Sequence, residues 1–182
     1  MPETLKPYDT LIDFVTGKQI ADIGAEANRQ SVERYLVNHK GFSREDIAVD
    51  VEISLDITGE PYQSLVDLVV SPDGGKTRLM AIKCCAGSPG SWEREILAAA
   101  RLLDKYQIPL AVVSDGKTAI VRDTVTGNKL GEGLDAIPSK QEALEQIKRF
   151  NPRPFPAERL EREKIIFRSY DSMKVNVLRK GS

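Results

Sequence analysis

The pattern of apolar residues between positions 47 and 86 constrains the fold more than any other feature of the chain. From Ile47 to Ile57 apolar and polar residues alternate, which is typical of a strand with one buried face. Two further apolar runs follow at residues 62–71 and 77–86, and residues 71–76 (SPDGGK) between them have the composition of a turn. Three consecutive strands joined by short turns predict an antiparallel meander.

Helical patterns lie on both sides of these strands. Residues 24–40 carry apolar side chains at helical spacing, and Gly41 stands where a helix end favours a left-handed residue. Ser139 followed by Glu142 has the spacing of a capping box. Further elements are predicted on the same grounds: helices at 10–15, 92–106, 139–150 and 157–170, and strands at 108–114 and 119–123. This order predicts a mixed central sheet flanked by helices, with extra C-terminal helices.

The chain of 182 residues is long enough to fold as one domain without disulfides or a structural metal. We divide it into an N-terminal extension (1–16), an α/β core (17–138) and a C-terminal helical extension (139–182), which contains the Pro-rich linker 151–156. One His and two adjacent cysteines argue against a multi-His zinc site and against a disulfide framework. Without a long apolar run or a signal-peptide core, we expect a cytoplasmic protein with no membrane role.

The net charge of −1 hides a gradient along the chain. Residues 1–70 carry 6 basic and 13 acidic side chains, whereas residues 139–182 carry 11 basic and 6 acidic ones. A polyanion would therefore be met mainly by the C-terminal third. The alternative is a solvated helix face, because acidic residues are interleaved there at helical spacing. The residues predicted to contact nucleic acid, called below the C-terminal basic residues, are Lys148, Arg149, Arg153, Arg159 and Arg162.

Two charged residues interrupt the apolar strands, Asp67 in the second and Lys83 in the third. An unpaired buried charge costs several kcal/mol, so each needs a partner, a metal or an opening to solvent. If residues 73–75 form a three-residue hairpin loop, Asp67 faces Ala81 and Lys83 follows one pair further on the same face of the sheet. Both charges are then expected at one place.

This order of elements resembles that of the PD-(D/E)XK nucleases. The closest likeness is to the N-terminal nuclease domain of the R subunit of type I restriction enzymes and its stand-alone relatives. The local sequences AEANRQ (25–30) and IPLAVVSDG (108–116) are similar as well, and the resemblance covers about residues 17–134. It implies a restriction-endonuclease-like fold acting on DNA, with restriction-modification or repair proteins as partners.

In that family a strand Asp and the Glu of a Glu-X-Lys tripeptide hold a divalent metal, the Lys acts on the attacking water, and a helix Glu adds an outer ligand. Carried over to this sequence, the resemblance implies Glu26 as the helix acid, Asp67 as the metal ligand and Lys83 as the lysine. The backbone carbonyl of Ile82 would be a further ligand, and Mg²⁺ is the implied cofactor, since it prefers hard oxygen ligands.

The sequence departs from the family pattern at one decisive position. The tripeptide here is Ala81-Ile82-Lys83, so the expected carboxylate is missing. The helix predicted at 92–106 also lacks the Gln of the family signature. We therefore predict a degenerate site that binds Mg²⁺ weakly, in a domain that binds DNA or a restriction or repair partner with little or no cleavage.

Two alternatives remain open from the sequence. In the first, the chain is an active metal-dependent endonuclease in which the acid has moved to Glu93 or Glu95 on the following helix. In the second, it is a protein-interaction module without a nucleic-acid role, which docks through the helix after Pro156.

Overall fold

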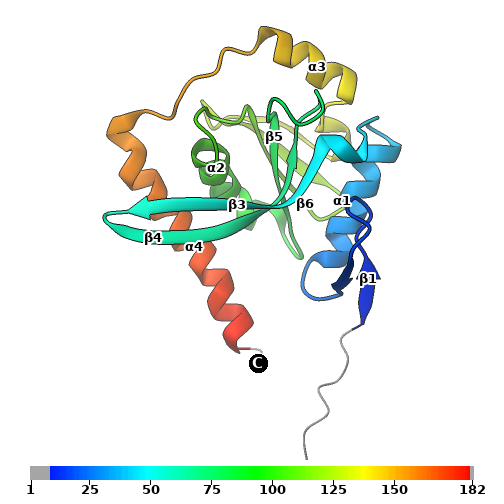
Figure 1. The fold of residues 1–182 in the computed structure, drawn as a ribbon, viewed down its shortest axis with the longest axis horizontal. Helices are drawn as coiled ribbons and strands as arrows, with labels where there is room; N and C mark the ends of the chain where they lie inside the picture. Colours follow the sequence, from blue (N-terminus) through cyan, green and yellow to red (C-terminus); the bar gives the residue numbers. More distant parts are fainter. Residues whose placement is uncertain (1–8, 181–182) are drawn as a thin grey trace, which may run out of the picture.

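The computed structural model describes residues 9–180, with side chains as far as Ser172 (Figure 1). Its strands are β1 (Thr10–Ile12), β2 (Gln19–Ala21), β3 (Ile47–Ile57), β4 (Glu60–Val70), β5 (Met80–Cys84), β6 (Leu110–Ser114), β7 (Ala119–Asp123) and β8 (Lys129–Glu132). Its helices are α1 (Glu26–Asn38), α2 (Glu93–Leu102), α3 (Lys140–Arg149) and α4 (Leu160–Lys180).

Strands β3 to β8 form one mixed sheet in chain order. All neighbouring pairs are antiparallel except β5 and β6, which run parallel. A parallel pair needs a crossover connection, and α2 supplies it. The predicted mixed α/β sheet is confirmed, while β8 was not predicted. In the part of the chain that the structure describes, no helix is long and apolar enough to cross a membrane.

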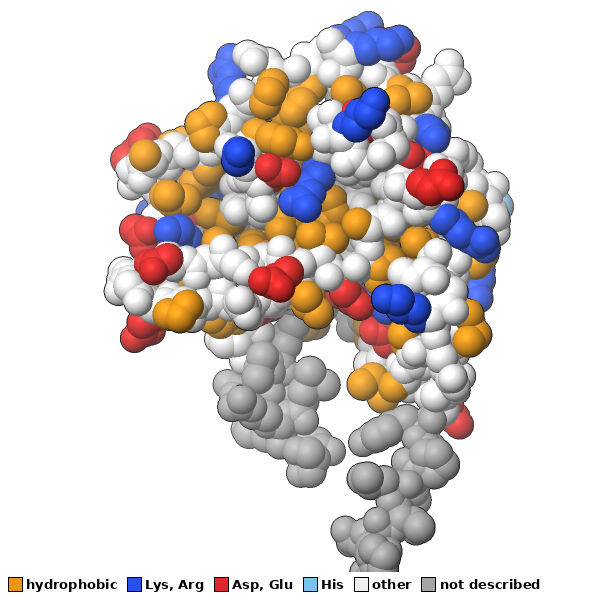
Figure 2. Space-filling view, in the orientation of Figure 1, with side chains coloured by type: hydrophobic (Ala, Val, Ile, Leu, Met, Phe, Trp, Pro, Cys, Tyr) orange, Lys and Arg blue, Asp and Glu red, His pale blue; other side chains and the backbone are white. Residues whose placement is uncertain are grey.

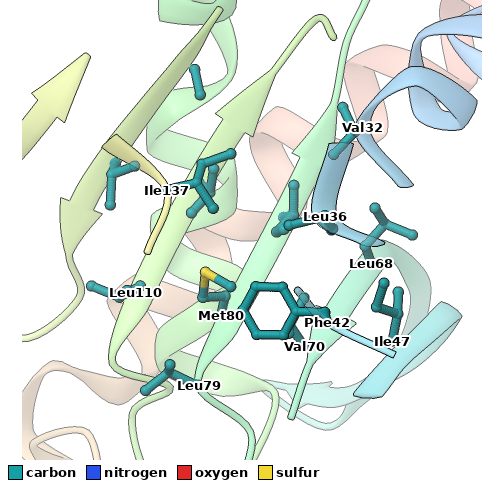
Figure 3. Packing of buried hydrophobic residues seen from close by; sticks show 14 of the residues in the cluster. Val32, Leu36, Phe42, Ile47, Leu68, Val70, Leu79, Met80, Leu110 and Ile137 are labelled. Atoms are coloured by element: carbon teal, nitrogen blue, oxygen red, sulfur yellow. The ribbon is translucent and has the colours of Figure 1, made fainter. Parts of the chain in front are cut away.

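The alternation of side chains along the strands divides the core into two apolar layers, one on each face of the sheet. On one face α1 packs through Val32 and Leu36 against Leu68 and Met80 (Figure 3). Ile82 belongs to the same cluster. The other face packs against α2 and α4, and its buried residues include Val69, Ala81, Ala111, Val113 and Phe167. Asp67 and Lys83 have the same parity as Val69 and Ala81, so they belong to the α2 face.

The predicted three-residue hairpin loop between β4 and β5 is wrong. Val70 pairs with Met80 and Leu68 with Ile82, so the connection spans residues 71–79. Asp73 holds this longer loop, because its carboxylate accepts the N–H groups of Lys76 and Thr77. The register is therefore displaced by two residues, which preserves the face on which each side chain lies.

The predicted short helix at residues 10–15 is also wrong, since β1 and β2 form a hairpin there. The turn of this hairpin is fixed by α1: the N–H of Phe14 donates to Gln30 Oε1 at 2.6 Å, and the N–H of Val15 donates to Glu33 Oε2 at 3.1 Å. Side chains of another element, rather than a helix, thus satisfy these donors. Residues 1–8 of the predicted N-terminal extension lie outside the described residues.

The predicted end of α1 and the predicted start of α3 are confirmed, whereas α2 ends at Leu102 instead of residue 106 and α4 continues to Lys180 instead of residue 170. Beyond the end of α1, Gly41 has a φ of +80° and Phe42 N–H donates to the carbonyl of Leu36. At α3, the N–H of Ser139 donates to Glu142 Oε2 while the N–H of Glu142 donates to Ser139 Oγ, which completes the predicted capping box. The linker 151–156 then arches from α3 to α4, which runs back beside α2 (Figure 1).

Candidate active site

A cavity of about 650 Å³ lies where the beginning of α1, the end of β5, the beginning of α2 and α4 meet; we call it the Lys83 cavity. Its volume is within the range of small-ligand and active sites. Its walls are mainly apolar and include two aromatic rings, those of Trp92 and Tyr170. The ionisable carboxylate and ammonium side chains that line it are Glu26, Asp67, Lys83 and Glu95.

The two charges that interrupt the strands form an ion pair. Lys83 Nζ lies 3.4 Å from Asp67 Oδ2, and the same oxygen accepts the N–H of Cys84 at 2.8 Å. The Lys83 ammonium also lies 5.1 Å from the centre of the Trp92 ring, within cation–π range. The observed register puts Asp67 directly opposite Lys83 instead of Ala81, because Leu68 pairs with Ile82. Both charges are thus compensated within the protein.

Glu26, the predicted helix acid, begins α1 and is paired with a buried arginine. Its Oε2 lies 2.7 Å from the guanidinium of Arg29, which is 4% exposed. Burial raises the pKa of Glu26 above its ordinary value, Arg29 opposes the rise, and the charges of Asp50 and Asp67 add to it. The charge of Asp67 therefore affects the pKa of Glu26, while the Glu26 carboxylate forms its ion pair with Arg29.

Arg29 is the centre of this part of the site, a role that sequence reasoning missed. Its guanidinium also lies 2.7 Å from Asp50 and 3.4 Å from Asp13. Asp50 has a left-handed backbone conformation, with a φ of +53°. At this residue, which lies opposite Asp67, the pairing of β3 with β4 is interrupted. The unusual backbone conformation of Asp50 therefore lies next to the Asp67–Lys83 ion pair. The Arg-Gln of the family resemblance was the signal that could have drawn attention to Arg29.

Ala81 is fully buried, pairs with Val69 and Ala111, and is not among the residues that line the cavity. Among the described residues no group of three or more His, Cys, Asp or Glu side chains lies close enough to hold a metal ion. Two of the carboxylates are also engaged, Asp67 by Lys83 and Glu26 by Arg29. The donor set of this conformation does not fit the metal site that the family resemblance implies.

The two glutamates that could replace the missing acid have different surroundings. Glu95 is 4% exposed and lines the Lys83 cavity. Glu93 instead forms an ion pair with Arg122 of β7. The structure thus separates two residues that the sequence left equivalent, and only Glu95 lies on the cavity wall with Asp67 and Lys83.

Helix α4 completes the cavity, although it lies outside the predicted core 17–138. Its buried Glu163 accepts two hydrogen bonds from Arg94, at 2.7 and 2.8 Å, and one from Arg101 at 3.0 Å. One turn further on, Phe167 is 1% exposed. These anchors bring Tyr170 to the cavity wall. The sequence carried no signal for this contact, because it joins segments far apart in the chain.

The C-terminal basic residues lie on α3, on the linker and at the start of α4. Lys148 is paired with Glu145, whereas Arg149 and Arg153 line a groove beside α3. This groove includes Pro109, next to the first residue of β6, while the Lys83 cavity lies at the last residues of β5. Since β5 and β6 are parallel, the two features lie at opposite ends of the sheet. In Figure 2 basic side chains are visible at the top of the molecule, over α3.

A family model described as type I restriction enzyme R protein N terminus (HSDR_N) matches residues 24–138. The matched segment contains Glu26, Asp67 and Lys83 and ends before α3. No curated protein matches the chain, and no solved structure does.

Proposed function

The chain belongs to the family of the type I restriction enzyme R protein N terminus, and from that premise we propose that it is a DNA-binding domain with a degenerate nuclease site. Its fold is then of the restriction-endonuclease type, as in the PD-(D/E)XK nucleases that the sequence resembles. In a restriction-modification context, such a domain binds DNA with little or no cleavage.

The observation that carries this proposal is the Asp67–Lys83 ion pair next to Ala81. At the position of the missing acid stands a methyl group, enclosed between Val69 and Ala111 in the core. A magnesium ion needs several oxygen ligands in near-octahedral arrangement. Lys83 neutralises the charge of Asp67 without such an ion. Weak Mg²⁺ binding is therefore part of the proposal.

Charge also indicates where DNA would bind. The Lys83 cavity is lined by three carboxylates and one ammonium group, so it repels phosphate unless a cation is present. The C-terminal basic residues offer the opposite charge at the other end of the sheet. Because α4 runs from these residues to Tyr170 at the cavity, a strand bound along α4 would connect the two ends.

The test is fluorescence anisotropy with a labelled duplex and a labelled single strand at increasing salt. The variant combines Arg149→Ala, Arg153→Ala and Arg162→Ala, all at exposed positions. The slope of log K against log salt is negative, and each lost phosphate contact reduces its magnitude by about 0.7–0.9, so we expect a reduction of about 2–3.

The control variant removes the same charge elsewhere on the surface, by Lys76→Ala, Lys105→Ala and Lys117→Ala, also at exposed positions. We expect it to bind DNA nearly as well as the wild type. If the wild type binds neither DNA at low salt, the proposal fails and the interaction-module alternative takes its place.

One observation favours a second candidate, an active nuclease with a displaced acid. Glu95 is buried in the cavity wall with Asp67 and Lys83, which is where a replacement acid would be needed. This candidate predicts cleavage of DNA with Mg²⁺ or Mn²⁺ that Glu95→Gln abolishes and that Glu93→Gln leaves in place. Equal cleavage by both variants, or none by the wild type, would exclude it.

A further inference from the structure

The groove beside α3, which we call the α3 groove, has a volume of about 730 Å³ and lies at the opposite end of the sheet from the Lys83 cavity. It runs between α3 and the ends of β6 and β7, close to the linker 151–156. Pro109, Val125 and Phe150 provide its apolar surface. Its polar residues include Gln107, Arg149 and Arg153.

Gln107 is 5% exposed and carries an unsatisfied acceptor. Its Nε2 donates to the carbonyl of Pro154 at 3.3 Å, and its backbone N–H donates to the carbonyl of Arg153 at 2.9 Å. The first of these bonds fixes the orientation of the amide. Its Oε1 is then left without a hydrogen-bond partner among the described residues. A buried acceptor in this state is costly, and an N–H donor of a ligand would satisfy it.

Each acidic side chain of the groove accepts a hydrogen bond within the protein, although only Glu145 is paired with a basic side chain. Glu142 accepts the N–H of Ser139, Glu145 is paired with Lys148, and Asp123 accepts hydrogen bonds from Thr126. By contrast, neither Arg149 nor Arg153 forms an ion pair within the described part of the chain. Two guanidinium groups are thus available to an anion, and guanidinium matches the geometry of phosphate.

We propose that the α3 groove binds a nucleoside monophosphate unit, either as a free nucleotide or as the end of a nucleic-acid strand. The phosphate contacts Arg149 and Arg153, the base packs on Pro109 and Phe150, and an N–H group of the base donates to Gln107 Oε1. Because this oxygen is covered in the structure, binding requires a small outward movement of the linker, which has no regular secondary structure. The inference rests on the proposed nucleic-acid role but names a site separate from the Lys83 cavity.

Calorimetry and NMR titration test the site with four small probes: AMP, ribose 5-phosphate, adenosine and purine riboside 5′-monophosphate, which lacks the amino group of AMP. We expect AMP to bind best. Each of the other three should bind about tenfold more weakly or worse, because each lacks one of the contacts. Equal affinity for AMP and ribose 5-phosphate would overturn the role of the base.

The variant with Arg149→Ala and Arg153→Ala should lose AMP binding by about tenfold or more, and both positions are exposed, so folding is not at risk. The variant with Lys76→Ala and Lys117→Ala is the matched control, since it removes the same charge at two exposed positions that do not line the groove. Unchanged affinity in the arginine variant would overturn the inference.

Titration with a single-stranded oligonucleotide distinguishes a free nucleotide from a strand end as the ligand. It also distinguishes failure of the α3 groove proposal from failure of the proposed DNA binding. Competition between AMP and the oligonucleotide would support a strand end as the natural ligand, and AMP binding without competition would support a free nucleotide. Binding of the oligonucleotide but not of AMP would overturn this inference and leave the proposed function intact. Binding of neither would overturn both.

Discussion

Glu33 gives the sharpest prediction about stability. It lies on α1, is fully buried, and accepts a hydrogen bond from the N–H of Val15. Its Oε1 lies 3.7 Å from Nε of Arg29. Burial, reinforced by the charge of Asp13, raises the pKa of Glu33 from 4.5 to about 8, against the opposing effects of Val15 and Arg29. The folded protein therefore holds a proton on Glu33 at neutral pH.

The sign of the pH dependence follows from this proton. Between pH 4.5 and about 8 the folded state binds a proton at Glu33 that the unfolded state has lost, so the free energy of unfolding falls as the pH rises. One pKa unit corresponds to about 1.4 kcal/mol, so the loss has an upper limit of about 5 kcal/mol. Glutamine at this position cannot ionise, and Glu33→Gln should remove this part of the pH dependence.

The assay is urea unfolding followed by circular dichroism at pH 5, 6.5 and 8. The wild type should become less stable as the pH rises across this window, whereas Glu33→Gln should change much less. Burial also raises the pKa of Glu26, which adds a slope of the same sign to both proteins. Glu45→Gln, at an exposed carboxylate, controls for the change in net charge. Equal slopes for the wild type and Glu33→Gln would show that Glu33 does not carry this proton in the folded protein.

Three further predictions concern the anchoring helix, the metal and a tight backbone position. Glu163→Ala should lower the free energy of unfolding by about 2–4 kcal/mol in urea denaturation, because it leaves two arginines without their shared partner; an unchanged midpoint would contradict this. Calorimetric titration should give a Mg²⁺ dissociation constant above about 1 mM, and a micromolar value would contradict the degenerate site. Gly116→Ala should destabilise more than Gly74→Ala in thermal unfolding, since both have a positive φ but only the first brings its Cβ within 2.8 Å of Ser31; equal losses would contradict the close contact.

Strands β3 to β7 could be predicted from the sequence because their patterns are local. The alternation from Ile47 to Ile57 matches β3 at both ends. The register of β4 with β5 could not be predicted, because it depends on how Asp73 folds the connecting loop. The hairpin of β1 and β2 was missed for a similar reason: its turn is held by Gln30 and Glu33 of another element.

In the candidate site, too, the sequence indicated some residues, whereas others could be found only from the folded structure. The residues expected from the family resemblance, Glu26, Asp67 and Lys83, all line one cavity, and their chemical roles remain predictions. Nothing in the sequence distinguished Glu95 from Glu93, since the difference lies in what each meets after folding. Tyr170 likewise reaches the cavity only through the packing of α4 on α2, which no local pattern records.

We expect that the Asp67–Lys83 site does not cleave DNA. The most direct measurement is incubation of plasmid and single-stranded DNA with the purified protein, with Mg²⁺ and with Mn²⁺, next to a Lys83→Ala variant. We predict intact DNA in every reaction, together with salt-dependent binding by the wild type. Cleavage by the wild type that Lys83→Ala abolishes would contradict the account and would make Glu95 the first residue to replace.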